Sequence, residues 1–237
     1  MSNRFGMVEC GKGISMDRDQ LHTARITSIL TAGAAFLMGF IDAYTFMKYE
    51  HVFVSAQTGN MVTFGVKLMS GHGVDALANV MSFAGFLGGA FLGEVLLARL
   101  QMPGLRKYRI FLYVQALLLL LLALFQSQFN PLVVIAALGL LSGYALTTFR
   151  KIGSTTVNNG IMTGNARNMM NSLYRILFEK DEQAKKEMLH LVIGIVTFTA
   201  GVGASASILL WNPFAVLWTA YGTVCLFIIA LFFYRWT

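Results

Sequence analysis

Charged residues are scarce in this 237-residue chain, at 12% of the sequence, while 56% of the residues are hydrophobic. A water-soluble domain carries roughly 25% charged residues, because it needs them to cover its surface. A soluble fold of this length could not hide so much apolar surface, whereas a lipid bilayer would solvate it. The scarcity of charge therefore excludes an ordinary soluble domain and indicates an integral membrane protein.

Cysteine, metal-ligand spacings and catalytic motifs are equally sparse. The two cysteines, Cys10 and Cys225, lie far apart, are interpreted as unpaired thiols and give no indication of a disulfide framework. No pair of histidines has metal-ligand spacing, and the sequence has neither a nucleophile–base motif nor a P-loop. We therefore expect no enzyme activity, no metal and no cofactor. The net charge of +7 does not indicate nucleic acid as a partner, because the basic residues fall in short clusters between apolar runs.

Six apolar runs approach the roughly 20 residues that cross the hydrocarbon layer of a membrane. They occupy residues 24–46, 76–98, 110–127, 131–149, 188–210 and 213–235. Two further stretches, 52–71 and 153–178, are rich in Ser, Thr, Asn and Gly and are too polar to face lipid all round. The polar residues 1–23 lack the apolar core of a secretory signal, so we predict a short flexible head. The predicted fold class is all-α, a polytopic helix bundle.

Loop charge decides how the two polar stretches enter the membrane, since positive residues prefer the cytoplasmic side of short loops. The head, the connection 99–109 and the stretch 150–187 are rich in Lys and Arg, while the links 128–130 and 211–212 contain neither. An even number of spans must then separate the head from the 99–109 connection. The distribution favours six spans, two re-entrant or broken polar segments and two cytoplasmic termini. Eight spans fit the charges worse.

The two polar stretches resemble each other. The triplet Thr58-Gly59-Asn60 recurs 105 residues later as Thr163-Gly164-Asn165, and Gly39 precedes the first copy as Gly143 precedes the second, 104 residues later. With three spans per half, the second copy begins on the opposite side of the membrane from the first. The pattern predicts an inverted 3+3 repeat. Many transporters use such repeats and place the substrate near the midplane, where the halves meet.

The halves of this repeat are residues 24–127 and 128–237. The runs GFIDAYTF from Gly39 and FVSAQTGN from Phe53 resemble the YoaK-like family of bacterial inner-membrane proteins, a domain of unknown function. The resemblance covers nearly the whole chain, from about residue 25 to 235. It implies a polytopic protein of the bacterial inner membrane, with no established substrate or reaction.

Two charged residues are candidates for a site. Asp42 near the end of the first span is interpreted as a proton or cation site, or alternatively as a helix-end carboxylate paired with Lys48 or a backbone donor. The second half has Leu146 at the equivalent place, which argues against a strictly symmetric mechanism. Arg167 has no position compatible with lipid unless it snorkels or meets an anion. It could neutralise Asp42 or bind an anionic substrate. A third carboxylate, Glu94, is expected to snorkel or to pair with the nearby Arg99.

The remaining candidates belong to the two polar stretches, where a Thr or Ser cap and a Gly could form a turn into a short helix. The N-terminus of such a half-helix favours anionic groups. Alternatively, these polar groups hydrogen-bond the two halves together. The predicted binding residues in these stretches are Gln57, Thr58, Gly59, Asn60, Asn159, Thr163, Gly164 and Asn165.

The favoured function is a small-solute transporter or channel with a polar pathway between the two triplets. The alternative is a non-transporting membrane protein that binds a lipid or a protein partner. Expected partners are membrane lipid and a small solute or ion, and a homo-oligomer is left open. Asn60 and Asn165 are predicted to contact each other, a solute or water near the midplane, because buried amides must find partners.

Overall fold

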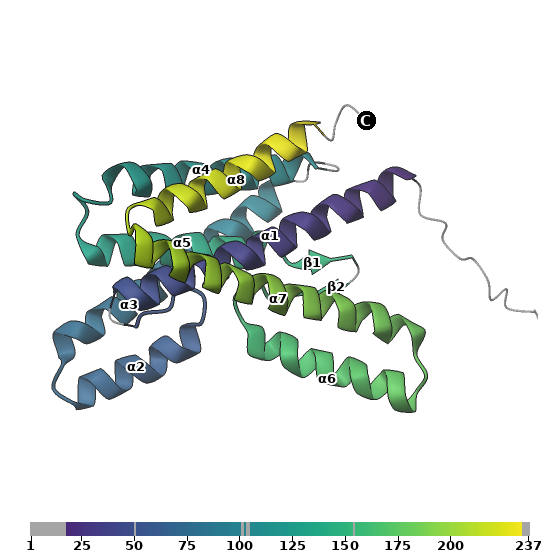
Figure 1. Ribbon diagram of the computed structural model, residues 1–237, viewed down its shortest axis with the longest axis horizontal. Coiled ribbons are helices and arrows are strands. Elements are labelled where there is room, and N and C mark those ends of the chain that lie inside the picture. Colours follow the sequence, from purple (N-terminus) through teal and green to yellow (C-terminus); the bar gives the residue numbers. More distant parts are fainter. Residues whose placement is uncertain (1–17, 50, 101, 103–104, 154, 234–237) are drawn as a thin grey trace, which may run out of the picture.

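The fold was analysed in a computed structural model, which describes residues 18–49, 51–100, 102, 105–153 and 155–233. Within these residues the chain forms helices joined by short links and one two-stranded hairpin (Figure 1). In chain order the elements are α1 (Arg18–Lys48), α2 (Gln57–Met69), α3 (Gly73–Arg99), α4 (Arg106–Phe125), α5 (Pro131–Thr148), β1 (Lys151–Ile152), β2 (Thr155–Thr156), α6 (Met162–Phe178), α7 (Glu182–Trp211) and α8 (Ala215–Phe233).

Six of these helices, α1, α3, α4, α5, α7 and α8, are long and apolar enough to cross a membrane. The predicted all-α bundle with six spans is thereby confirmed. The two polar stretches contain α2, with 13 residues, and α6, with 17 residues, which are not among the candidate spans. At about 1.5 Å per residue, α2 reaches only about 20 Å, which is less than the hydrocarbon thickness of about 30 Å.

The head and the hairpin differ from the sequence expectation. Helix α1 begins at Arg18, so residues 18–23 are helical, although the prediction placed them in the flexible head. Residues 1–17 of that head lie outside the described part of the chain. The hairpin pairs Lys151 with Thr156 and turns through Gly153, whose φ of +57° suits glycine. It was not predicted, because two-residue strands leave no alternating pattern in a sequence.

The path of the chain explains the two short helices. After α1 the chain turns back to the middle of the molecule, where α2 begins, and α2 leads out towards one end (Figure 1). After α5 and the hairpin the chain again reaches the middle, where α6 begins and runs towards the opposite end. Both half-helices therefore have their N-terminal ends near the centre of the bundle.

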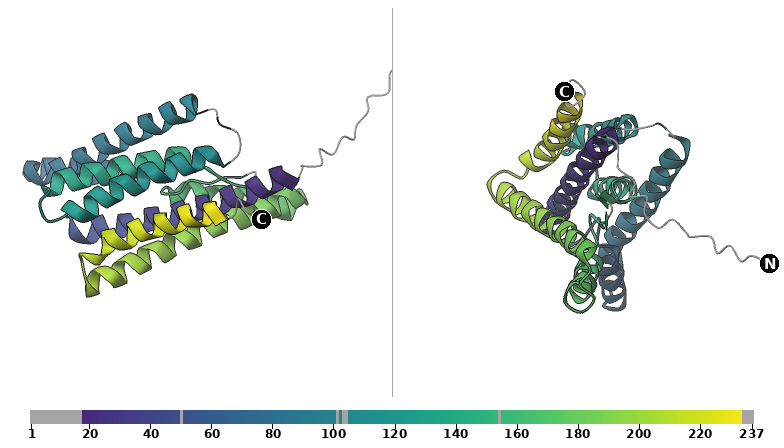
Figure 2. Two further views of the ribbon diagram at one scale, coloured as in Figure 1. Left: turned by 90° about the horizontal axis from the view of Figure 1, so that it is seen from above. Right: turned by 90° about the vertical axis from the view of Figure 1, so that its right-hand side faces the viewer.

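Helices α1 and α5 form the interior of the bundle (Figure 2). In their spanning stretches 67% and 56% of residues are buried, against 17–33% in the other four spans. Each inner helix packs closely on one outer helix, α1 on α7 and α5 on α3. A Cβ added at Gly201 would lie 2.0 Å from the carbonyl oxygen of Phe36, and one at Gly89 would lie 1.9 Å from that of Leu140. Glycine is required at both contacts because the backbones touch.

The basic links gather at one end of the molecule. The start of α1, the α3–α4 link and the α6–α7 turn lie at the right-hand end in Figure 1, and the links without Lys or Arg lie at the other end. Glu94 at this basic end pairs with Arg150 at 3.2 Å, which corrects the expectation of Arg99 as its partner. Arg150 follows α5, the helix on which α3 packs, so this packing brings Arg150 close to Glu94.

Candidate functional site

Asn60 closes the loop that precedes α2. Its side-chain oxygen accepts a hydrogen bond from the backbone N–H of Phe53 at 2.9 Å, and its Nδ2 donates to the carbonyl oxygen of the same residue. The amide also donates to Gln57 Oε1 at 2.9 Å and to Ser82 Oγ at 3.1 Å. One buried side chain thus supplies both partners that the Phe53 backbone needs.

Asn165 does the same for the loop before α6. It accepts from the N–H of Asn158 at 2.9 Å and donates to the carbonyl oxygen of Asn158 at 2.7 Å. The two loops are therefore closed by equivalent bonds between residues that lie 105 positions apart, Asn60 with Phe53 and Asn165 with Asn158. Asn60 and Asn165 bond these loops rather than each other, so the predicted contact between the two amides is wrong. A contact of either amide with a solute or water stays a prediction.

The two loops meet instead at Ser55 and Gly160, which are also 105 positions apart. Ser55 Oγ lies 3.1 Å from the carbonyl oxygen of Gly160, within hydrogen-bonding distance. A Cβ added at Gly160 would lie 2.4 Å from the Cβ of Ser55, so the loops touch at this point. Equivalent residues of the two copies are here in direct contact.

Asp42 holds the first of these loops from α1. Its Oδ1 accepts from the N–H groups of Val54 and Ser55 at 2.8 and 2.9 Å, and its Oδ2 is hydrogen-bonded to Ser55 Oγ. The side chain is buried, at 3% exposure. Of the alternatives weighed for Asp42, a backbone donor is present, whereas Lys48 donates to Tyr44 at 2.9 Å instead.

A cavity of about 760 Å³ lies beside this meeting point. The beginnings of both half-helices line it, together with parts of α1, α3 and α7. Five predicted site residues are in its lining, namely Asp42, Gln57, Thr58, Gly59 and Thr163. Thr58 and Thr163 are exposed, so the cavity is open at this side.

Four phenylalanines of the lining were missed by the sequence analysis. Phe46 and Phe53 come from α1 and the following loop, with ring centroids 5.0 Å apart. Phe86 of α3 and Phe198 of α7 line the cavity from the two halves. In the sequence, Phe86 and Phe198 are marked only by their place in the small-residue spans. A Phe in such a span is ordinarily interpreted as a lipid-facing residue.

The other predicted site residues lie outside the cavity lining. Asn60, Asn159 and Asn165 are buried, and Asn159 donates to the carbonyl oxygen of Phe149. Gly164 is half-buried beside Asn158. Arg167 is exposed on α6, and the described partners of Asp42 are Val54 and Ser55, so the predicted pairing of Arg167 with Asp42 is corrected.

The predicted caps of the half-helices also differ. Ala56 precedes α2 and Ile161 precedes α6, and neither makes a side-chain cap bond. Thr58 lies one residue inside α2 and Thr163 one residue inside α6, where they face the cavity rather than the helix start.

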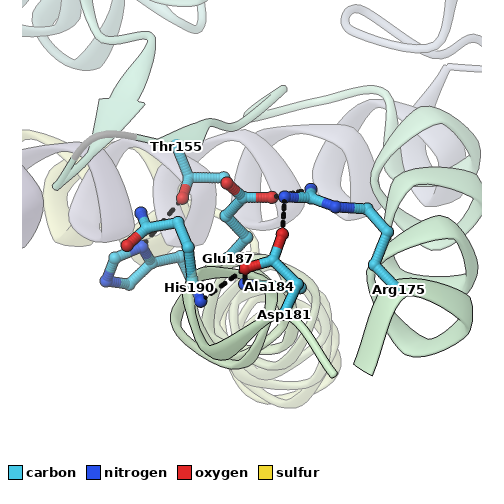
Figure 3. Close-up of polar contacts among 7 residues, drawn as sticks. Thr155, Arg175, Asp181, Ala184, Glu187 and His190 are labelled. Atoms are coloured by element: carbon cyan, nitrogen blue, oxygen red, sulfur yellow. Dashed lines mark hydrogen bonds and ion pairs between the residues drawn. The ribbon is translucent and has the colours of Figure 1, made fainter. Parts of the chain in front are cut away.

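A second polar cluster lies at the turn between α6 and α7 (Figure 3). Arg175 bonds Glu187 at 2.6 Å and also bonds Asp181, which caps α7 through the N–H of Gln183 at 2.8 Å. The hydrogen bond from Arg175 lowers the pKa of the Asp181 carboxyl below its usual value, and the same bond raises the pKa of Arg175. This cluster fastens α6 to α7 and lies apart from the cavity.

Six apolar spans, with two shorter helices that begin at the middle of the bundle, define an α-helical multi-span membrane protein. A family model described as "Protein of unknown function (DUF1275)" matches residues 30–231, and the chain belongs to this family. The expected family of unknown function is thus supported, while the YoaK-like name remains a resemblance. A search of curated proteins and a search of solved structures find no match.

Proposed function

We propose that the protein is a small-solute transporter or channel whose pathway passes through the cavity at the N-terminal ends of α2 and α6. The observation that carries the proposal is that the first residues of both half-helices line this one cavity. Broken backbone at membrane depth is tolerated where it is buried in protein or lines a water-filled cavity. Transporters use such half-helices to form substrate sites near the midplane.

An inverted repeat is part of this proposal. It is supported by the equivalent loop bonds at Asn60 and Asn165 and by the equivalent helix contacts at Gly89 and Gly201. The equivalent helices α1 and α5 run in opposite directions through the molecule (Figure 1). An inverted pair of halves can open a central site towards either side by exchanging their arrangements.

The orientation follows from the basic end of the molecule, which we place at the cytoplasmic face of a bacterial inner membrane. Single cysteines at Ser127 and Asn212 should then react with a membrane-impermeant maleimide in intact cells, while a cysteine at Lys107 should react only after permeabilisation. Strong labelling at position 107 in intact cells would contradict this orientation.

A second candidate function is binding of a lipid or a protein partner without transport. The apolar lining favours it, because phenylalanine and aliphatic side chains would also accommodate an acyl chain. The two functions differ in whether water reaches the cavity.

Water access is tested by single cysteines at Thr58 and Thr163 in a chain with Cys10 and Cys225 replaced by serine. In the transport proposal, both react with the impermeant cationic thiol reagent MTSET, and reactivity differs between intact cells and inverted vesicles. A cysteine at Leu226, which is exposed on α8, is the matched control that lipid should protect. Protection of positions 58 and 163 from both sides would overturn transport and favour the lipid-binding function.

A further inference from the structure

The cavity has an unbalanced charge. Among the described residues that line it, Asp42 is the one with a formal charge, and the lining contains no Lys, Arg or His. A buried charge in a protein is normally paired, because removing it from water costs several kcal/mol. The described partners of the Asp42 carboxylate are three hydrogen-bond donors without charge, so a proton or a bound cation is the charge that could neutralise it.

The rest of the lining suits an apolar cation. Phenylalanine faces attract cations that approach within about 6 Å of the ring. Phe46, Phe53, Phe86 and Phe198 bring four such rings to the cavity that Asp42 lines. Its volume of about 760 Å³ is within the range of roughly 300–1,000 Å³ of pockets for drug-sized molecules.

The same residues disfavour an anion. Arg167, the sequence candidate for an anionic ligand, is exposed and outside the lining. The free N–H groups at the starts of α2 and α6 carry partial positive charge, which is spread over several groups and fades within the first turn. The carboxylate is a localised full charge in the same cavity, so an anion there would meet a like charge.

Ser55 links the charge on Asp42 to the contact between the halves. Its hydroxyl has one proton and lies within hydrogen-bonding distance of two acceptors, Asp42 Oδ2 and the carbonyl oxygen of Gly160. When Asp42 is ionised, the hydroxyl donates to the carboxylate. When Asp42 is protonated, its O–H donates to Ser55 Oγ, and the Ser55 proton is free to donate to Gly160.

We propose that the cavity binds apolar organic cations at the Asp42 carboxylate in exchange with a proton, and that protonation transfers the Ser55 hydrogen bond to Gly160. The proposal takes the cavity of the proposed function as its site. The cation and the proton exclude each other, because both use the same carboxylate, and the displaced proton leaves to water. A proton gradient could then drive the cation the other way.

Few other titratable groups surround this carboxylate. On α1, Tyr44 and Lys48 bond each other. Among the described residues of the loop, α6 and α7 that line the cavity with Asp42, none titrates. His190 of α7 bonds Thr155 and is outside the lining. His51 of the loop is outside the lining, but its ring centroid lies 4.6 Å from that of Phe46. A pH dependence of cation binding is therefore assigned to Asp42 when it persists in His51→Gln.

Equilibrium dialysis of the purified full-length protein with radiolabelled tetraphenylphosphonium tests the proposal. We expect saturable binding that weakens as the pH falls, up to about tenfold in apparent Kd per pH unit, because one proton competes with one cation. Tetraphenylborate has the same shape and the opposite charge, and when it is dialysed alone as the radiolabelled ligand it should not bind saturably. Saturable binding of tetraphenylborate with a similar Kd, or tetraphenylphosphonium binding that does not change with pH, would overturn the proposal without any variant.

Variants then locate the site. Asp42→Asn should weaken binding at least tenfold and remove its pH dependence, while the control Glu94→Gln removes a half-exposed carboxylate and should leave both unchanged. If Asp42→Asn does not fold, Phe86→Leu and Phe198→Leu should each weaken binding and retain the pH dependence. Unchanged binding in all of these variants would refute the site.

The cation-binding proposal and the transport proposal can fail independently. Tetraphenylphosphonium binding without pH-driven uptake into proteoliposomes would keep the cation site and overturn transport. Water access at positions 58 and 163 without tetraphenylphosphonium binding would keep the pathway and overturn the cation site.

Discussion

Replacing either of the two loop-closing asparagines with alanine should destabilise the fold strongly, because each change leaves two polar groups of the protein without their partners. In Asn165→Ala, the N–H and the carbonyl oxygen of Asn158 both lose the partners that the side chain supplied. In Asn60→Ala, the N–H of Phe53 and the Nδ2 of Asn79 lose the oxygen that accepts from them, while the carbonyl oxygen of Phe53 keeps the hydrogen bond from Ser82 Oγ at 2.7 Å.

The magnitudes follow from the number of groups left unpaired. A buried donor or acceptor without a partner costs about 1–3 kcal/mol. Two such groups give about 2–6 kcal/mol for Asn165→Ala. Asn60→Ala also leaves two groups without the Asn60 oxygen, together with the lost bond to Gln57 Oε1, which places it in the same range. Asn165→Asp keeps the acceptor but places a carboxylate at a fully buried position against the carbonyl oxygen of Asn158, so it should destabilise the fold at least as much as Asn165→Ala.

Thermal unfolding of the three variants in one detergent, followed by intrinsic fluorescence, measures these effects. We expect all three variants to have a lower Tm than wild type, with Asn165→Asp no more stable than Asn165→Ala. Unchanged Tm in both alanine variants would refute the assignment of these amides as loop closures.

Two further predictions concern packing and the α6–α7 turn. Gly89→Ala should lower Tm strongly, because its Cβ would lie 1.9 Å from the backbone oxygen of Leu140. The control Gly88→Ala should leave Tm nearly unchanged, because its Cβ would meet nothing within 4 Å. Equal effects of the two changes would contradict the helix contact. Because the pKa of Asp181 is lowered, its pairing with Arg175 stabilises the turn above the ordinary pKa of 3.8 and is lost as the pH falls below that value. Pepsin cleavage at this turn should therefore rise from about pH 4.5 to about pH 2.5, and Arg175→Ala should already be cleaved at the higher pH; identical cleavage of both proteins would argue against the ion pairs.

The spans and the non-spanning nature of the two polar stretches could be predicted from the sequence, because hydropathy and loop charge act over many residues. Which member of each triplet faces the cavity could not be read from composition. Successive helix residues are about 100° apart, so Thr58 and Asn60 lie on nearly opposite faces. The structure turns the threonine to the cavity and the asparagine to the loop.

The error at Arg167 has a different cause. Arg167 follows Thr163 by four residues, so it lies on the same face of α6 but about one helical turn further from the start of the helix, where it is exposed and outside the cavity lining. The helical period alone therefore does not exclude Arg167, because the extent of the cavity along α6 decides its place. The four phenylalanines of the cavity lining could not be predicted from the sequence, because their position depends on which helices pack together. No local sequence pattern encodes that packing.

The contact between Ser55 and Gly160 has a consequence for movement. Two equivalent residues of a repeat can touch only where the axis that relates the two halves passes close to both residues. In the proposed inverted repeat, an exchange of roles between the halves displaces every atom in proportion to its distance from that axis, so this contact is nearly a fixed pivot. Asp42 is bonded to Ser55 and shares its position, so a cation held there would remain almost still while the walls of the cavity moved around it.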